Sequence, residues 1–193
     1  MRVPIDWLRE YVAVPTDARG TDVAAALVKV GLEEEGIHGG DITGPVVVGR
    51  VISKEPQEQK NGKTINWCQV DVGDANGTGE PQGIVCGAHN FDAGDWVVCV
   101  LPGAVLPGGF AISARKTYGH VSAGMICAAD ELGLPDDGSG GIIRLAERVP
   151  GVEFTAGQDA LPILGLDRET VEINVTPDRG YCFCSVSYTH LTP

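Results

Sequence analysis

The sequence predicts a mainly β chain with α+β character, in which a small closed barrel is inserted into a discontinuous α/β domain. The first observation is a succession of short apolar segments in residues 84–134, where Pro102-Gly103 and Pro107-Gly108 each favour a tight turn. The second is that residues 1–40 and the residues from 151 onward each hold too few elements for a separate core. Closely spaced short strands are typical of a barrel, and two incomplete cores are explained if they share one.

The expected barrel strands alternate with turns through the middle of the chain. They are residues 45–52, 64–72, 84–86, 95–101, 110–112 and 141–145. Residues 122–127 lead into a short helical stretch that Gly133 ends before the last strand. Alternation in the second strand sends one set of side chains inward, Cys68, Val70 and Val72, and leaves the other set outside, Trp67, Gln69 and Asp71.

Two Gly- and Pro-containing boundaries divide the chain. We expect residues 1–40 and 151–183 to form the discontinuous domain and residues 41–150 to form the barrel. Residues 184–193, CSVSYTHLTP, have no charged residue and no helical stripe, which indicates a non-native tail. A genuine short C-terminus is the alternative.

The first forty residues predict two helices that pack on flanking strands. Pro4 suits the first position of a helix whose expected apolar face is Leu8, Tyr11 and Val12, and Trp7 is expected to fill the core beside it. Thr21 is the expected N-cap of a second helix, residues 22–30, which turns Val23, Leu27 and Val30 toward the core. Strands at 1–3, at 32–37 and around Val171 and Ile173 complete the domain.

The charge balance argues against a broad polyanion-binding surface. The chain has 14 basic and 26 acidic residues and a net charge of −12. Residues 41–150 alone hold 8 basic and 13 acidic residues. Any contact with a nucleic acid must therefore come from a local cationic patch.

No pattern in the sequence predicts a catalytic centre or a metal site. The six cysteines lack zinc-like or redox spacing and most lie in apolar strand patterns, so we expect buried, reduced thiols and a cytoplasmic protein. The Gly-rich stretches 73–81 and 137–141 lack the Lys-Ser/Thr of a phosphate-binding loop. No nucleophile–base pair is evident, and no apolar run is long enough to span a membrane.

Several ordered motifs nevertheless resemble one family. VCGAHN, LPGAVLPGGF and the pattern S-x-GM-x-C-x-x-x-ELGL are similar to the tRNA-binding, five-stranded oligonucleotide-binding-fold domain of bacterial phenylalanine–tRNA ligase β subunits. MRVPIDWLREYV, LVKVGLEEEGI and VEINVTPDRG resemble the opening domain of the same subunits. One departure is EPQEQKNGK at 55–63, where the family commonly has a His-Pro-Asn-Ala-Asp segment.

The resemblance implies an N-terminal β-subunit segment that contributes tRNA binding and subunit structure to a class II aminoacyl-tRNA synthetase. The whole enzyme uses ATP and Mg²⁺ to charge tRNA(Phe) and is an α2β2 tetramer, and its adenylate chemistry belongs to the α subunit. This chain by itself is expected to hold no cofactor and to be inactive. The alternatives are a free-standing tRNA-binding chaperone or cofactor, and a protein-docking module that binds no RNA.

One outer face of the barrel is the candidate RNA contact. An aromatic side chain on the solvent side of such a barrel can stack on an unpaired base while nearby cations hold the backbone. The predicted set is Trp67 for stacking, with phosphate contacts from Lys54, Lys60, Lys63, Arg115 and Lys116. The competing interpretation is that Trp67 packs on the neighbouring domain or under the loop of residues 54–63.

Overall fold

The computed structural model describes residues 1–59, 62–135, 138, 140–174 and 176. The chain divides into two compact units, a small unit of residues 1–40 and 166–193 and a barrel unit of residues 41–165. The expected tail, 184–193, lies outside the described residues, as do Lys60, Cys182 and Cys184. Among the described residues no helix is long and apolar enough to cross a membrane.

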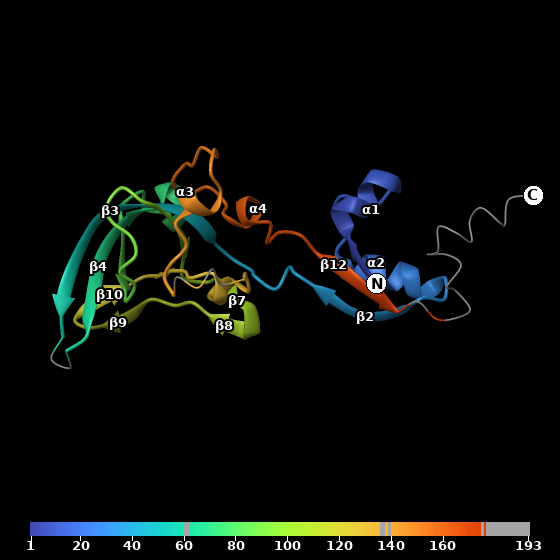
Figure 1. Ribbon diagram of the computed structural model, residues 1–193, viewed down its shortest axis with the longest axis horizontal. Coiled ribbons are helices and arrows are strands. Elements are labelled where there is room, and N and C mark those ends of the chain that lie inside the picture. Colours follow the sequence, from blue (N-terminus) through green and yellow to red (C-terminus); the bar gives the residue numbers. More distant parts are fainter. Residues whose placement is uncertain (60–61, 136–137, 139, 175, 177–193) are drawn as a thin grey trace, which may run out of the picture. The chain divides into compact units, whose positions relative to one another are not determined.

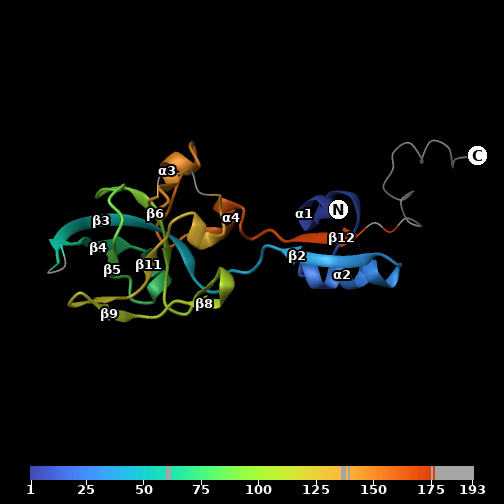
Figure 2. The same ribbon diagram turned by 60° about the horizontal axis from the view of Figure 1, so that its bottom comes forward.

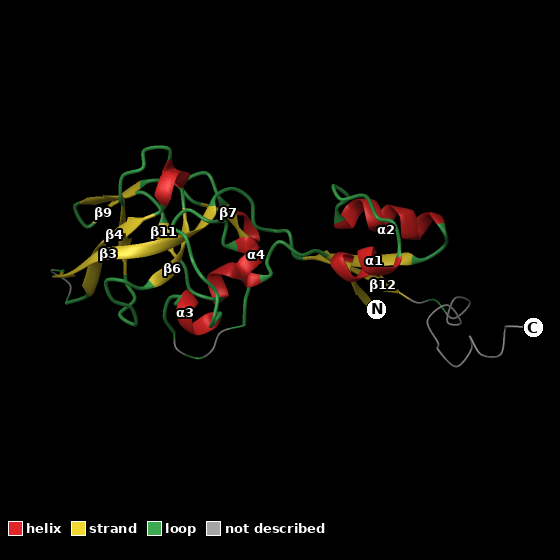
Figure 3. Cartoon of the chain, turned by 90° about the horizontal axis from the view of Figure 1, so that it is seen from above, coloured by secondary structure: helices red, strands yellow, loops and turns green. Residues whose placement is uncertain are grey.

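The barrel unit is built on a five-stranded antiparallel sheet with the order β11-β6-β3-β4-β5. Figure 1 labels β3 and β4, and Figure 2 labels all five strands. Its strands are β3 (Val46–Glu58), β4 (Thr64–Asp71), β5 (Gln82–Cys86), β6 (Trp96–Val100) and β11 (Met125–Ile126). The two edges of the sheet meet, because the Ala123 amide donates to the Gly83 carbonyl at 3.0 Å just before β11 begins. The sheet is therefore nearly closed (Figure 3), which confirms the predicted small barrel.

Strand β3 curls tightly enough to serve both halves of the barrel. Its first half pairs with β6 and its second half with β4, and the register with β4 shifts between Val51 and Ser53. A Cβ atom at Gly49 would come within 2.7 Å of both Cys99 Sγ and Val70 Cγ1. Glycine thus lets the strand bend over its own core at the point where the two pairings overlap.

Alternation in β4 fixes the barrel core. Cys68, Val70 and Val72 are completely buried, whereas Trp67, Gln69 and Asp71 are only partly covered, as predicted. Phe91, from the loop between β5 and β6, is 1% exposed and packs into the same cluster. The core is thus filled by strand side chains and by one aromatic ring supplied by a loop.

Two of the expected barrel strands are wrong. Residues 110–111 form β8 (Phe110–Ala111), which pairs with β7 (Val105–Leu106) in a separate two-stranded sheet. Residues 141–144 make only isolated bridges, at Ile142 and Arg144, and a helix begins at Leu145. The Asn90 side chain binds both the amide and the carbonyl of Ile142 at 3.0 Å. The side-chain amide thereby occupies backbone groups that a ladder partner would need, and β11 supplies the fifth strand instead.

Short elements complete the barrel unit. A hairpin is formed by β9 (Arg115–Thr117) and β10 (His120–Ser122), and its two turn residues, Tyr118 and Gly119, both have positive φ. The short helices are the 3₁₀ segments η1 (Gly73–Asn76), η2 (Pro107–Gly109) and η3 (Asp130–Leu132) and the single turns α3 (Leu145–Arg148) and α4 (Leu161–Leu164).

The second boundary between the units lies at residues 165–166, fifteen positions later than the sequence suggests. Strand β4 pairs with β3 only from Arg50 onward, which leaves one edge of Val46–Val48 open. Residues 157–160 fill that edge: Val48 bonds to the Gln158 carbonyl and the Gly157 amide, both at 2.8 Å, and Ala160 bonds to Val46 at 2.9 Å. Residues 151–165 therefore belong to the barrel unit.

The small unit joins the two ends of the described chain in one sheet. Its order is β1-β12-β2, with β1 (Arg2–Pro4), β12 (Thr170–Asn174) and β2 (Glu33–His38) (Figure 2). Helices α1 (Ile5–Tyr11) and α2 (Gly20–Lys29) contribute to its core through Ile5, Val23 and Ala24. Val171 and Ile173 of β12 lie in the same cluster, so residues separated by more than a hundred positions bury each other.

The expectations for five residues of the small unit are wrong. Trp7 is 67% exposed, Tyr11 81% and Val12 51%, because α1 is short and packs mainly through Ile5 and Leu8. Val30 is 58% exposed because α2 ends at Lys29. The N-cap of α2 is Arg19 rather than Thr21, since the Glu169 carboxylate accepts a hydrogen bond from the Gly20 amide and holds the helix start there.

Candidate functional site

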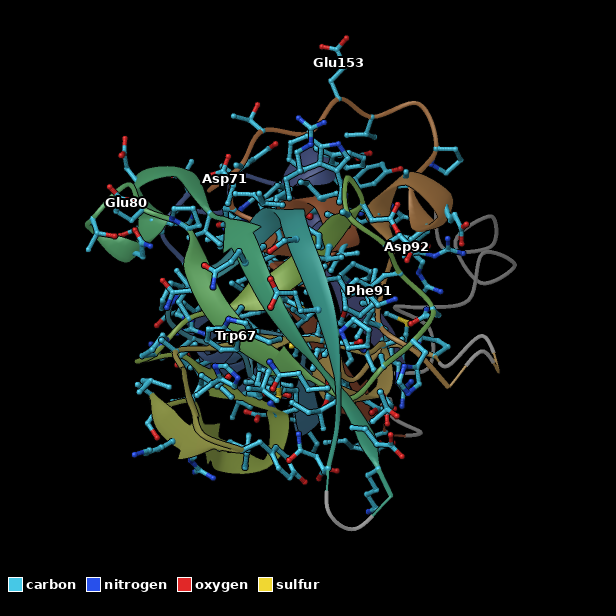
Figure 4. All side chains as sticks on the ribbon, turned by 90° about the vertical axis from the view of Figure 1, so that its left-hand side faces the viewer. Trp67, Asp71, Glu80, Phe91, Asp92 and Glu153 are labelled. Carbon is cyan, nitrogen blue, oxygen red and sulfur yellow. The ribbon has the colours of Figure 1, made fainter. Side chains whose placement is uncertain are left out.

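Trp67 lies under the β9–β10 hairpin rather than on an open face. Its indole stacks on the His120 imidazole with ring centroids 4.2 Å apart and an interplanar angle of 17°. Its six-membered ring also fills the space where a side chain at Gly83 would be, since a Cβ there would lie 2.5 Å from Trp67 Cη2. Figure 4 shows Trp67 to one side of β3 and β4, with Phe91 and Asp92 to the other. The ring face that stacks on His120 is therefore closed to a base.

The hairpin is held in this position from two directions. His120 Nε2 lies 3.0 Å from Gln57 Oε1 on β3, and the Ser122 hydroxyl accepts from the Val85 amide of β5 at 3.0 Å while donating to the Gly124 carbonyl at 3.1 Å. These contacts link β10 to the second half of β3 and to β5. The hairpin is thus a fixed part of the barrel surface.

Lys54 is engaged by a loop. Its side chain is only 16% exposed, and its ammonium donates to the Phe91 carbonyl and reaches Asp92 Oδ1 at 3.3 Å. The ammonium also lies 4.8 Å from the centroid of the Phe91 ring. This cation clamps the β5–β6 loop over the core, so a contact with phosphate would require the clamp to open.

The other predicted cations that the structure describes are exposed residues. Arg115 and Lys116 are exposed on β9, and Lys63 is exposed just before β4. The Arg115 guanidinium lies 5.9 Å from the centroid of the Phe110 ring, and its Nε donates to the Ser113 hydroxyl at 3.4 Å. Arg115 and Lys116 thus lie on the same hairpin as His120, which stacks on Trp67, and Lys54 faces a different environment.

A surface cavity that the sequence did not predict opens beside this hairpin. We call it the hairpin cavity; its volume is about 180 Å³ and it is lined by Val85, Phe110, Ala111, Ile112, Ser113, Arg115, Thr117, Ser122, Gly124 and Met125. Phe110 is 51% exposed. An aromatic face, a guanidinium and two kinds of hydroxyl thus border one small apolar depression, which can receive a flat ring and an adjacent anion. The signal in the sequence was an aromatic residue, Phe110, five positions before Arg115 and six before Lys116.

A second cavity of about 380 Å³ has mixed charge. Its lining is Asn90, Ala129, Gly141, Ile142, Ile143, Arg144, Glu147 and Arg148. The Asn90 amide is already bonded to Ile142, and Arg144 forms an ion pair with Glu147 at 2.5 Å. Its polar groups largely satisfy one another, so it is less suited to a polyanion than the hairpin cavity.

The buried cysteines are in an environment that makes their thiols unreactive. Cys68, Cys86, Cys99 and Cys127 are free and buried in the barrel core, and burial raises the pKa of each thiol, that of Cys68 to about 12. A thiol with a raised pKa is a poor nucleophile and a poor metal ligand. Across the described part of the chain, no three His, Cys, Asp or Glu side chains are grouped to hold a metal ion.

Comparison with known proteins identifies the family of this barrel. Residues 46–153 match the family described as "putative tRNA binding domain". The chain belongs to this tRNA-binding domain family. The matched range begins with β3 and includes every strand of the barrel sheet and the whole lining of the hairpin cavity.

Curated relatives extend the similarity to the small unit. The phenylalanine–tRNA ligase β subunits of Streptomyces avermitilis and Cutibacterium acnes are 59% and 51% identical over 184 and 194 residues, which cover 94% of this chain in both cases. That of Leifsonia xyli is 53% identical over 206 residues and covers the whole chain. These matches confirm the family resemblance predicted from the motifs. The chain spans only about a fifth of the length of these relatives, 21% to 24%.

Similarity to solved structures is weaker. The crystal structure of the chaperone CsaA from Bacillus anthracis aligns with a TM-score of 0.41 and 13% identity, over 59% of this chain and 87% of that one. The nearly closed sheet of the tRNA-binding domain is established by its own strand pairing and not by this similarity.

Proposed function

We propose that this chain is the tRNA-binding part of a phenylalanine–tRNA ligase β subunit and that its RNA contact is the hairpin cavity with the adjoining β9 cations. The observation that carries this proposal is the placement of Phe110 and Arg115 at one exposed depression of the tRNA-binding domain. The relatives that match both units are phenylalanine–tRNA ligase β subunits. A free-standing chaperone would have no use for the small unit that these relatives share.

The binding chemistry follows from size and charge. The cavity has room for about six water molecules and is smaller than pockets for drug-sized ligands, so it suits one splayed base rather than a larger group. Phe110 offers the stacking surface, and Arg115 and Lys116 offer phosphate contacts. Because the whole chain carries −12, we expect a Kd of roughly 10⁻⁴–10⁻⁶ M that rises steeply with salt.

The test compares four substitutions, Phe110→Ala, Arg115→Glu, Trp67→Ala and the control Arg50→Glu, in a tRNA titration at two salt concentrations. Phe110→Ala should weaken binding about 5- to 150-fold, since one base–aromatic stack contributes about 1–3 kcal/mol. Arg115→Glu should weaken binding and flatten the salt dependence by about one unit of slope for each lost phosphate contact. Arg50→Glu is the matched control, because Arg50 also lies over an aromatic ring, Trp96 at 5.5 Å, but lines no part of the hairpin cavity.

The outcomes distinguish the hairpin cavity from the face of Trp67, which the sequence predicted as the RNA contact. If Trp67→Ala abolishes binding while Phe110→Ala has no effect, the contact lies on the face of Trp67. If Arg50→Glu weakens binding as much as Arg115→Glu, only the overall charge matters. Tight binding that is insensitive to salt would contradict the proposal altogether.

The enzymatic role is that of a noncatalytic segment. We infer that adenylate formation, with its ATP and Mg²⁺, takes place elsewhere in an α2β2 enzyme that includes an α subunit and acts on tRNA(Phe) in the cytoplasm. The free, buried cysteines support a reducing compartment. The isolated chain should show no ATP–pyrophosphate exchange. Exchange proportional to its concentration would refute the inference that adenylate formation takes place outside this chain.

A further inference from the structure

Among the described residues of the small unit, the two most exposed aromatic side chains lie together on α1. Trp7 and Tyr11 are 67% and 81% exposed, and Val12 beside them is 51% exposed. Residues four positions apart on a helix lie on the same face, so the two rings form one patch. We call Trp7, Tyr11 and Val12 the α1 patch. Trp and Tyr are the side chains most enriched at the energetic centres of protein interfaces.

The neighbouring loop is fastened so that it leaves the α1 patch uncovered. The Arg9 guanidinium, on another side of α1, donates to the carbonyls of Pro15, Thr16 and Ala18 at 3.1–3.3 Å. It also pairs with Asp6 at 3.4 Å. These bonds hold the chain that leaves the helix at Arg9.

Charge favours a protein as the occupant rather than RNA. The described residues of the small unit include five basic and ten acidic side chains, a net charge of −5. The phosphate backbone of RNA would be repelled by such a surface. Glu10, which lies between the two rings in sequence, is exposed and would face a cationic rim on the partner.

The area of the patch decides between a separate partner and a tethered one. The exposed parts of Trp7 and Tyr11 amount to roughly 300 Å², given the surface of aromatic side chains. A stable interface between separate proteins needs about 800 Å² from each side. A tethered segment, however, is present at an effective concentration in the millimolar range, so a much smaller contact is sufficient.

Two further observations point to a tether. The matched relatives are about four to five times longer than this chain. The last described strand, β12, belongs to the small unit, so the polypeptide that follows leaves from the unit that carries the patch. We propose that the α1 patch docks into an apolar cleft with a cationic rim in the later part of the same β-subunit polypeptide. This inference rests on the proposed β-subunit identity.

Radical footprinting read by mass spectrometry tests the proposal. The isolated chain is compared with a full-length chimera in which it replaces the matching first fifth of the Streptomyces avermitilis β subunit. Oxidation of Trp7 and Tyr11 should be fast in the isolated chain and severalfold slower in the chimera. Equal rates in the two proteins would overturn the proposal, and so would protection in the isolated chain, which would place the cover within these 193 residues.

Paired substitutions give a second reading. The double variant Trp7→Ala, Tyr11→Ala should lower the melting temperature of the chimera and leave that of the isolated chain nearly unchanged. Val28→Ala is the matched control, because Val28 is 50% exposed on α2, outside the patch. A double variant as harmless as the control in the chimera would contradict docking. Concentration-dependent self-association that the double variant abolishes would instead identify a second copy as the occupant.

A chimera that does not fold is replaced by mixing the parts. The labelled isolated chain at about 1 mM is combined with the Streptomyces avermitilis polypeptide lacking its first fifth, which imitates the tethered concentration. The indole N–H resonance of Trp7 should shift, and an unchanged resonance would overturn the proposal. Titration of the same proteins with tRNA reports on the RNA site separately, so protection of the patch without tRNA binding would refute only the RNA proposal.

Discussion

The two compact units bury their apolar side chains to very different extents. Among described residues, the large apolar side chains that are exposed number six in the small unit's 50 positions and five in the barrel unit's 120. The small unit's core cluster has five buried members, whereas one cluster of the barrel has thirteen. Closing a sheet removes its edges and its open face together, while a three-stranded sheet with two short helices cannot do so.

Polar ties compensate for the small core. Glu169 accepts hydrogen bonds from the Gly20 amide and, at 2.6 and 3.0 Å, from the Arg19 guanidinium, which joins the start of α2 to the residue before β12. Glu172 joins β12 to Arg2 of β1 at 3.2 Å and to His38 of β2 at 2.5 Å. The barrel is therefore stabilised mainly by packing and the small unit to a larger degree by charge, so the two should respond to different perturbations.

The largest difference should follow removal of the loop-borne ring in the barrel. Phe91→Ala should lower the free energy of unfolding of the barrel unit by about 3–5 kcal/mol, because it opens a cavity in a close-packed core. Hydrogen exchange should accelerate in β4 and remain nearly unchanged in β12. The control is Phe110→Ala, which removes a half-exposed ring and should change stability by less than about 0.5 kcal/mol. Equal effects of the two substitutions would mean that Phe91 is not a core residue.

The next largest effect should come from the polar tie in the small unit. Glu169→Ala should cost about 1.5–3 kcal/mol, since its 13% exposed carboxylate bonds to a guanidinium and to a helix-terminal amide. Exchange of α2 and β12 amides should accelerate while that of β4 does not. Glu10→Ala, an exposed carboxylate of α1, is the control that should have no effect. Acceleration throughout both units would show that they unfold together.

Strand alternation predicted much of the barrel because it reports directly on burial. Cys68, Val70 and Val72 were placed inside from their spacing alone. The failure at 141–145 has a different cause, since the Asn90 side chain replaces a strand as the partner of Ile142. Trp7 was misplaced because helix periodicity does not reveal that α1 has too little neighbouring structure to cover both of its sides.

Only part of the candidate site was accessible from the sequence. Arg115 and Lys116 were predicted because cations at a strand end are visible in the sequence, and of the two Arg115 lines the hairpin cavity. Phe110 was overlooked, since the run Phe-Ala-Ile resembles a buried strand. Lys54 was included because its sequence position does not show that a loop thirty-five to thirty-eight residues away surrounds its ammonium. The hairpin depends on a positive φ at Tyr118. Tyrosine seldom adopts this conformation, so the sequence does not predict a turn there.

A substitution in the β9–β10 hairpin should destabilise the barrel unit less than the core substitution Phe91→Ala does. His120→Ala removes the stack on Trp67 and the contact with Gln57, which should cost about 0.5–1.5 kcal/mol in aromatic pairing. Trp67 fluorescence should become more sensitive to soluble quenchers, and tRNA affinity should fall because the hairpin cavity loses its fixed wall. The comparison variant is His120→Phe, which retains a ring. Rescue of both readouts by phenylalanine would attribute the effect to stacking, and failure of either to change in the alanine variant would contradict the fixed hairpin.

The smallest effect is the response of the two units to acid. Burial opposes ionisation of Glu169, yet its hydrogen bonds from Gly20 and Arg19 prevail and lower its pKa; His38 and Arg2 lower that of Glu172. A carboxylate whose folded-state pKa is lowered stabilises the fold at pH values above the unfolded pKa of about 4.3, and this stabilisation is lost as the pH falls through the folded value. The small unit should therefore loosen between about pH 4.5 and the lower folded-state pKa values, as hydrogen exchange of β12 relative to β6 would measure.

Protonation removes charge but retains the side chain, so the loss should be smaller than in Glu169→Ala. The variant Glu169→Gln should make β12 less sensitive to pH in this range. If its acid response equals that of the unmodified chain, Glu169 is not the responsible group, and if β6 loosens in step with β12, the division into a packed and a charge-tied unit is wrong.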